Sequence, residues 1–237
     1  KINNLYWKIT IIVPIYNERK TIEKIVFKIN QQKKISKQII LIDDCSTDGT
    51  TEIIKEKLLK KVDLVIFKKK NSGKSAAIKS AVPKIKGEIV IIQDADLEYD
   101  PKDYAKLIKP IQLRLTNAVY GSRVLNKNRY KEPNFTSNFR VFANHLLTVL
   151  SNILYSQKLT DAHTCYKVIE TKVFKRLDIK EKRFGFCPEV TAQLSKKNIN
   201  ILEVPISYRG RTFDDGKKIS LKDAIRAIYV LIKYKFI

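Results

Sequence analysis

Two aspartates separated by one residue follow a short apolar segment near the middle of the chain. Asp94 and Asp96 come directly after residues 88–93, and Glu98 lies two positions further on. Two carboxylates so close repel each other unless a cation lies between them. Because all-oxygen ligand sets favour hard cations, we expect Asp94, Asp96 and Glu98 to bind Mg²⁺ or Mn²⁺, which would neutralise a diphosphate leaving group. Asp-x-Asp pairs also occur in solvated acidic loops, so the position after a strand is what favours the metal site.

A second cluster, PIYNE, ends the first apolar segment at residues 14–18. Pro14 fixes the direction of the chain as it leaves a strand. Tyr16 offers a ring that can stack on a base, and Glu18 can accept hydrogen bonds from a base or a ribose. The alternative is an ordinary turn with an acidic residue at a helix N-terminus, which the helix dipole also favours.

Asp43 and Asp44 end another apolar segment and precede a turn rich in Ser, Thr, Asp and Gly. A carboxylate in this position can hold a ribose or a base, as it does in dinucleotide-binding folds. We therefore predict that Asp43 and Asp44 belong to a nucleotide site. Helix capping is the competing role, and we assign it to Asp48.

The segment NSGKS at residues 71–75 ends like a Walker A motif. That motif requires a glycine where Lys68 stands, so the P-loop interpretation fails. A glycine followed by Lys74 at the start of a helix still suits contact with a diphosphate.

The second half of the chain offers arginines and lysines in place of carboxylates. Arginine binds phosphate through two parallel hydrogen bonds, although each basic residue alone is expected on the surface. The stretch RGRTFDDGKK at residues 209–218 contains turn residues that would let it fold over a ligand. His145, His163 and the cysteines form no nucleophilic pair, so we assign them to the structure.

The elements that must position these residues alternate between strands and helices. Apolar runs predict strands at 9–15, 38–42, 63–67, 88–93 and 199–204, and another strand precedes the segment Gly121-Ser122-Arg123. Helical spacing or start signals predict helices at 21–30, 48–59, 74–82, 101–113, 140–155 and 220–234. This alternation indicates an α/β fold with a mostly parallel central sheet and helices on both faces. Ligands bind at the carboxyl ends of such strands, where three of the predicted strands bring their acidic residues.

The composition limits the classes of protein that the chain can belong to. Its 237 residues, 44% hydrophobic and 30% charged, are enough for one large domain. Three cysteines without a Cys-x-x-Cys pair argue against a disulfide framework or a structural zinc site. The net charge of +23 suits anionic partners, although a general bias toward lysine explains it equally well. No signal peptide or apolar run of transmembrane length is apparent, so we expect a cytoplasmic protein whose membrane contact is peripheral.

Six segments, taken in order, resemble those of glycosyltransferase family 2, and within it the dolichyl- or polyprenyl-phosphate mannosyltransferases. They are VPIYNE, DDCSTDGT, NSGKSAA, DADLEYDP, GSR and YRGRTFDDGKKIS, and they span Val13 to Ser220. The resemblance implies a GT-A fold, the Rossmann-like fold of nucleotide-diphospho-sugar transferases. It implies a catalytic domain at 1–220, with a nucleotide-sugar half at 9–122 and an acceptor half at 123–220. A C-terminal amphipathic helix would follow at 221–237.

The resemblance also implies roles for individual residues. The nucleotide would be held by Pro14, Tyr16, Glu18, Asp43, Asp44, Lys74 and Asp94. The metal would be bound by Asp94, Asp96 and Glu98, although similar enzymes often carry Gln where Glu98 stands. The acceptor phosphate would be held by Arg123, Arg140, Asn144, Arg211 and Lys218. Asp96, Arg123 and Arg211 would contribute most directly to catalysis.

The reaction that the resemblance implies is inverting transfer of a hexose to a polyprenyl or dolichyl phosphate on the cytoplasmic face of a membrane. GDP-mannose is the favoured donor, so mannose would be the transferred sugar, and a UDP-hexose is the second candidate donor. A lipid phosphate has a second pKa of roughly 6, so it can attack the anomeric carbon without a general base. A hydroxyl acceptor would need a carboxylate base, for which Asp161, Glu189 and Asp214 are candidates.

Two other functions are compatible with the sequence. One is a family 2 enzyme that extends a cell-surface polysaccharide at a glycan hydroxyl. The other is a non-catalytic, basic protein that binds nucleotides or nucleic acid. Acidic residues at the strand ends oppose the binding of a polyanion there, so we expect no nucleic-acid partner.

Overall fold

The structure is a computed structural model that describes residues 7–125, 138–181, 185–211 and 221–237. The strands are β1 Ile9–Ile15, β2 Lys37–Asp43, β3 Leu64–Phe67, β4 Ile89–Ile92, β5 Ala118–Ser122, β6 Lys167–Glu170 and β7 Ile201–Pro205. The helices are α1 Ile22–Asn30, α2 Thr50–Ile53, α3 Lys74–Ala81, α4 Tyr104–Gln112, α5 Asn138–Tyr155, α6 Thr171–Phe174, α7 Phe186–Lys196 and α8 Leu221–Phe236. Short π or 3₁₀ turns cover Ile54–Leu58, Leu59–Lys61, Val82–Lys84 and Pro101–Asp103.

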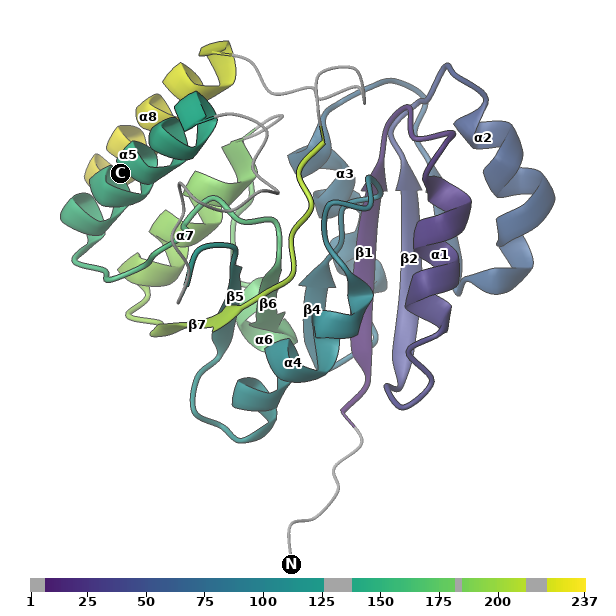
Figure 1. Ribbon diagram of the computed structural model, residues 1–237, viewed down its shortest axis with the longest axis horizontal. Helices are drawn as coiled ribbons and strands as arrows, with labels where there is room; N and C mark the ends of the chain where they lie inside the picture. The colour runs from purple at the N-terminus through teal and green to yellow at the C-terminus, as the bar shows by residue number, and fades with distance from the viewer. Residues whose placement is uncertain (1–6, 126–137, 182–184, 212–220) are drawn as a thin grey trace, which may run out of the picture.

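The described strands form one sheet in the order β3-β2-β1-β4-β6-β5-β7. All neighbouring strands run parallel except at β6, which is antiparallel to both β4 and β5. The prediction of a mostly parallel sheet is therefore confirmed. The parallel register brings the carboxyl ends of β1, β2 and β4 to one edge of the sheet (Figure 1).

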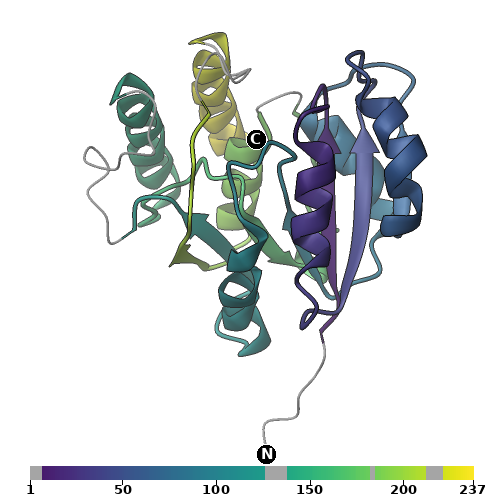
Figure 2. The ribbon, with the colours of Figure 1, turned by 45° about the vertical axis from the view of Figure 1, so that its right-hand side comes forward.

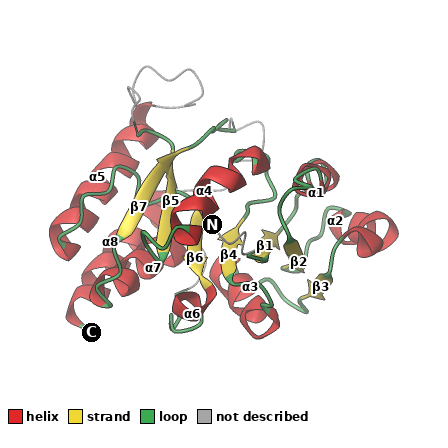
Figure 3. Ribbon diagram, turned by 90° about the horizontal axis from the view of Figure 1, so that it is seen from below, coloured by secondary structure: helices red, strands yellow, loops and turns green. Residues whose placement is uncertain are grey.

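Helices cover both faces of the sheet, as the sequence predicts. Helices α1 and α4 lie on one face, and α3, α6 and α7 lie on the other (Figure 3). Every residue of β4 is buried, and so is every residue of β1 except Pro14. Strands enclosed on both sides bury apolar residues along their whole length, which explains the nearly continuous apolar runs in the sequence.

Four elements depart from the sequence-based expectation. The sequence pattern did not predict β6, α6 or α7. Strand β6 is four residues long and begins with the charged Lys167, so it lacks an apolar signature. The helix predicted at 48–59 begins at Thr50 after Gly49, whose φ is 93°, and widens into a π turn. Ile54 and Leu58 of this turn are buried, and the turn contacts α1.

Helices α5, α7 and α8 lie together at the end of the molecule opposite α1 and α2 (Figure 1). The rotated view also shows α5 and α8 at that end (Figure 2). The predicted C-terminal amphipathic helix is α8, which packs against α5 and α7. The Tyr155 hydroxyl donates to the Leu231 carbonyl at 2.7 Å, and Arg226 and Lys233 both pair with Glu181. Within the described ranges, no helix has the length and apolarity needed to cross a bilayer.

Candidate active site

The loops that leave β1, β2 and β4 share an unusual backbone feature. Each contains a non-glycine residue in the left-handed region, with φ of 55° at Asn17, 66° at Cys45 and 65° at Leu97. Each such residue costs on the order of 1–3 kcal/mol, and this kind of strain clusters at functional sites. The turns direct six carboxylates to one place, which we call the acidic edge: Glu18, Asp43, Asp44, Asp94, Asp96 and Glu98.

Asp94 and Asp96 lie in different electrostatic surroundings. Asp94 forms an ion pair with Lys74, the first residue of α3. Burial, together with the negative charges of Asp94 and Glu98, raises the pKa of Asp96 to about 7, and Arg211 opposes the shift. Asp96 therefore lies where a second positive charge is favoured.

Arg211 connects the carboxylates that follow β1 and β4. Its Nη1 and Nη2 donate to the two oxygens of Glu18, each at 3.1 Å, and Nη2 also lies 3.2 Å from Asp96 Oδ2. Its backbone N–H donates to Glu98 Oε1 at 2.8 Å. Burial lowers the pKa of Arg211, but Asp96 and Glu18 more than compensate and raise it overall. Arg211 is thus the counter-ion of the acidic edge.

The three predicted metal ligands, Asp94, Asp96 and Glu98, have different protein partners in the structure. Glu98 Oε2 accepts from the Tyr208 hydroxyl at 2.9 Å, and Oε1 accepts from the Arg211 backbone. Across the ranges that the structure describes, no group of three His, Cys, Asp or Glu side chains is arranged to hold a metal ion. Both carboxylate oxygens of Glu98 therefore have protein partners in this structure, and its role as a metal ligand stays a prediction. Mg²⁺ sites on nucleotides commonly use only one or two carboxylates with substrate phosphates, and the mutual repulsion of Asp94 and Asp96 fits that donor set.

Asp43 and Asp44 organise the loops around them. Asp43 accepts from Ser46 N at 3.1 Å and from the Thr51 hydroxyl. Asp44 accepts from Gly73 N at 2.6 Å and from Ser72 N, so it ties the end of β2 to the start of α3. In the structure these carboxylates bind protein groups, and their nucleotide-binding role stays a prediction.

The remaining predicted nucleotide residues occupy the same edge. Pro14 lies at the end of β1 opposite Ile42 of β2. Tyr16 follows directly and keeps 37% of its surface exposed, so a base can reach its ring. Lys74 begins α3 after Gly73 and is held toward Asp94. The structure thus brings all the predicted nucleotide residues to one edge of the sheet.

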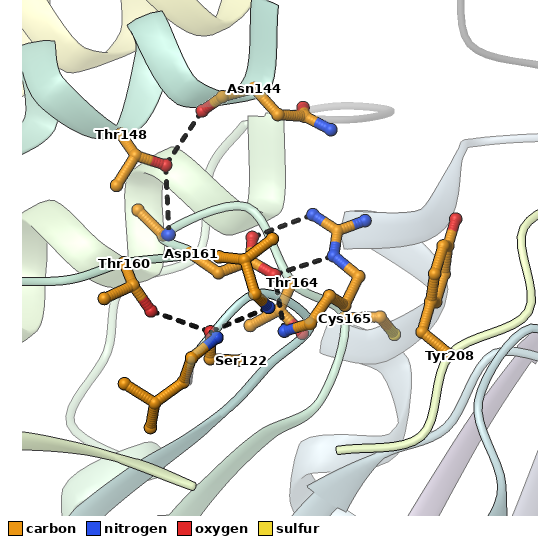
Figure 4. A network of polar contacts seen from close by, with 12 residues as sticks. Ser122, Asn144, Thr148, Thr160, Asp161, Thr164, Cys165 and Tyr208 are labelled. Atoms are coloured by element: carbon orange, nitrogen blue, oxygen red, sulfur yellow. Dashed lines mark hydrogen bonds and ion pairs between the residues drawn. The ribbon is translucent and has the colours of Figure 1, made fainter. Parts of the chain in front are cut away.

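Arg123 lies at a separate small cavity that we call the arginine pocket, lined by Arg123, Val124, Val141, Asn144, Thr148, Thr160 and Asp161. Arg123 is only 8% exposed, and its Nε and Nη2 donate to the two oxygens of Asp161 at 2.7 and 2.8 Å. Burial raises the pKa of Asp161, but Arg123 outweighs burial and lowers it overall. The sequence-predicted Asn144 lies in the same pocket (Figure 4).

Tyr208 connects the arginine pocket with the acidic edge. Its ring centroid lies 5.1 Å from the guanidinium carbon of Arg123, and its hydroxyl donates to Glu98. Sequence reasoning missed this residue. Its only signal was its place in the segment YRGR, which also carries Arg211.

Some predicted residues could not be placed at the site. Arg140 lies in the first turn of α5, but its side chain is not among those described. Lys218 and Asp214 lie outside the described residues. Arg211, predicted to bind the acceptor phosphate, is bound to Glu18 and Asp96 in this structure.

The family model described as glycosyl transferase family 2 matches residues 10–178. A UDP-N-acetylglucosamine–dolichyl-phosphate N-acetylglucosaminyltransferase of Methanococcus voltae is 27% identical over 246 residues, covering 96% of this chain and 96% of that protein. A dolichol-phosphate mannosyltransferase of Pyrococcus furiosus is 26% identical over 235 residues, covering 96% of this chain and 64% of that protein.

Solved structures resemble the chain over nearly its whole length. Glucosyl-3-phosphoglycerate synthase from Mycobacterium tuberculosis, in complex with Mn²⁺, UDP and phosphoglyceric acid, matches with a TM-score of 0.72 and 17% sequence identity. The match covers 98% of this chain and 79% of that one. The GT-A fold implied by the sequence segments is thereby confirmed.

Proposed function

Because the chain belongs to glycosyl transferase family 2, we propose that it transfers a hexose from a nucleotide sugar to a polyprenyl phosphate with the help of Mg²⁺ or Mn²⁺. The observation that supports this most is the arginine pocket, where a buried guanidinium lies in a cavity next to Asn144. Tyr208 lies between that cavity and the acidic edge and contacts a residue of each. One site therefore suits an anionic acceptor, and the other suits a donor bound through a cation.

The donor would bind along the acidic edge. Asp94 and Asp96 would hold the divalent ion, which neutralises the charge of the departing nucleoside diphosphate. Lys74 would turn from Asp94 toward the diphosphate, and Arg211 would leave Glu18 and Asp96. GDP-mannose is the favoured donor by sequence resemblance and by the named mannosyltransferase relative, whereas the Methanococcus voltae relative supports a UDP-linked sugar.

The acceptor phosphate would be both ligand and nucleophile, held by Arg123 and Asn144 with Arg140 and Lys218 as further predicted contacts. Such a phosphate needs positioning and charge neutralisation, but no general base. The two candidate bases that the structure describes are already engaged. Asp161 is held by Arg123, and Glu189 is fully buried and accepts from the backbone of residues 180 and 181 and from Tyr234. This favours a phosphate over a glycan hydroxyl.

We further propose that the exposed apolar face of α5 and α8 rests on a membrane surface, at the cytoplasmic side, and receives the lipid tail. Exposed apolar side chains recur along both helices at helical spacing: Phe142, Leu146, Val149 and Ile153 on α5, and Ile225, Tyr229, Ile232 and Phe236 on α8. Asn144 and Thr148 of the arginine pocket lie on the same helix α5. A lipid whose phosphate binds in the pocket can therefore pass its tail along this face.

A donor screen tests the proposed reaction. Purified protein would be incubated with undecaprenyl phosphate, Mn²⁺ or Mg²⁺, and GDP-mannose, UDP-glucose or UDP-N-acetylglucosamine in turn. Sugar entering the lipid phase together with release of nucleoside diphosphate supports the proposal and identifies the donor. Nucleoside diphosphate release that requires a glycan, with no lipid product from any donor, contradicts it.

Vesicle binding tests the membrane contact. We expect Ile153→Asp and Ile225→Asp to reduce co-sedimentation with vesicles containing anionic lipid by about tenfold, because each places a charge in an apolar contact. Phe27→Asp, on the exposed surface of α1, is the matched control. Equal losses in all three variants would contradict the assignment of this face.

A further inference from the structure

A carboxylate on the edge strand β7 binds two residues that line the arginine pocket. Glu203 lies on β7 in register with Tyr120 of β5, the strand that ends just before Arg123. Its Oε2 accepts from Thr160 N at 2.7 Å and from the Thr160 hydroxyl at 2.9 Å, and its Oε1 accepts from Asp161 N at 2.9 Å. One carboxylate thus fixes two consecutive residues of the segment between α5 and β6.

The next link is the ion pair of Asp161 with Arg123. Besides the guanidinium, the backbone N–H of Arg123 donates to Asp161 Oδ2 at 3.1 Å. Asp161 therefore fixes both the main chain and the side chain of Arg123. These contacts use Nε and Nη2, so Nη1 takes no part in the ion pair with Asp161.

A chain of hydroxyl groups ties the same segment to the end of β5 (Figure 4). Ser122 Oγ accepts from Val124 N at 3.2 Å and from Leu125 N at 3.0 Å, and it lies 2.7 Å from Thr160 Oγ1. Since an ionised Glu203 can only accept, Thr160 donates to Glu203 and Ser122 donates to Thr160. In this series of hydrogen bonds, the hydroxyl of Ser122 donates to Thr160 and that of Thr160 donates to Glu203, the final acceptor.

We infer that Glu203 is a positioning residue for the acceptor phosphate: it acts through Thr160 and Asp161 to set the orientation of the Arg123 guanidinium. Glu203 does not line the pocket and touches no proposed substrate. A guanidinium binds phosphate well only when the plane of its fork is correctly directed. The inference rests on the proposed function, because it assumes that Arg123 binds the acceptor phosphate.

The test uses binding of farnesyl phosphate, a soluble prenyl phosphate, and of UDP and GDP with Mn²⁺ to the full chain. Glu203→Gln replaces one of the two acceptor oxygens with an NH₂ group, which cannot accept from the backbone N–H of residue 160 or 161 that it faces. We expect it to weaken farnesyl phosphate binding about tenfold, the effect of a lost hydrogen bond to a charged group, and to leave nucleotide binding unchanged. Thr160→Val, which removes only the hydroxyl, should give a smaller loss of the same kind.

The controls separate this inference from the proposed function. Glu170→Gln changes a glutamate at the end of β6, which bonds Asn117 away from the pocket, and should leave every affinity unchanged. If Arg123→Ala weakens farnesyl phosphate binding but Glu203→Gln does not, the positioning role is wrong and the acceptor site stands. If Arg123→Ala has no effect, the proposed acceptor site is itself wrong. Equal losses of lipid and nucleotide binding in Glu203→Gln, with a lower unfolding temperature, would show a merely structural role.

Discussion

The acidic edge and the arginine pocket both pair buried opposite charges, but they do so in opposite ways. At the acidic edge, carboxylates that follow β1 and β4 are matched by Lys74 and Arg211, which come from other segments. In the arginine pocket, one cation is held by Asp161, whose own position is set by Glu203. In the proposed function, the first set of pairs would be exchanged for a metal ion and a diphosphate, whereas the second would stay as a fixed scaffold.

This difference has an energetic cause. The pairs of Arg211 with Glu18 and Asp96 leave 18% of the arginine side chain exposed, so water can replace its partners. The Arg123 side chain is 9% exposed and that of Asp161 is 5% exposed. Breaking a buried pair leaves an uncompensated charge, which makes that geometry persistent.

The largest effect should follow from removing a carboxylate of the acidic edge. We expect Asp96→Ala to lower sugar transfer by at least about a hundredfold, the loss seen when one electrostatic contact to a developing charge is removed. The unfolding temperature should not fall, since Asp96 is destabilised by Asp94 and Glu98. The measurement is product formation under saturating donor and Mn²⁺. Glu88→Ala, at the opposite end of β4, is the control, and full activity in Asp96→Ala would remove the metal assignment.

The second effect concerns the stability of the fixed scaffold. Asp161→Asn leaves Arg123 buried without its counter-charge, so we expect the free energy of unfolding to fall by about 3 kcal/mol. Urea denaturation measures it. Asp178→Asn, which alters the exposed pair with Lys180, should leave the denaturation midpoint unchanged. If both variants unfold alike, the arginine pocket is not the rigid scaffold described above.

The smallest effect concerns the competition between Arg211 and the metal ion for the carboxylates of the acidic edge. Arg211→Ala removes the counter-ion of Glu18 and Asp96, so the protein without nucleotide should bind Mn²⁺ roughly fivefold more tightly, equivalent to about 1 kcal/mol. Sugar transfer should fall in the same variant. Calorimetric titration with Mn²⁺ measures the affinity, and weaker binding would mean that Arg211 does not compete with the metal.

The acidic edge was predictable from the sequence because its residues follow apolar strands directly. Asp94 and Asp96 follow a buried strand, and strands alternate with helices along the sequence, which indicates a parallel sheet. These two signals were enough to place both residues at the same sheet edge as Glu18 and Asp44. What the sequence could not predict was that Glu98 accepts a hydrogen bond from Tyr208, since that contact joins residues 110 positions apart.

The arginine pocket was predictable only in its arginine and its asparagine. The resemblance indicates Arg123 and Asn144, whereas the sequence offers Asp161 only as a candidate base and gives no signal for Glu203. Their roles depend on the pairing of β5 with β7 and on a strand, β6, that carries no apolar signature. Long-range pairings of this kind are not encoded in local spacing.

The central claim is that a lipid phosphate, held by Arg123, is the nucleophile. The most direct measurement compares undecaprenyl phosphate with undecaprenol as acceptors, using the best donor from the screen, in wild type and in Arg123→Ala. We predict lipid-linked sugar from the phosphate only, with strong loss in the variant. Equal transfer to the alcohol, unaffected by the substitution, would contradict the account.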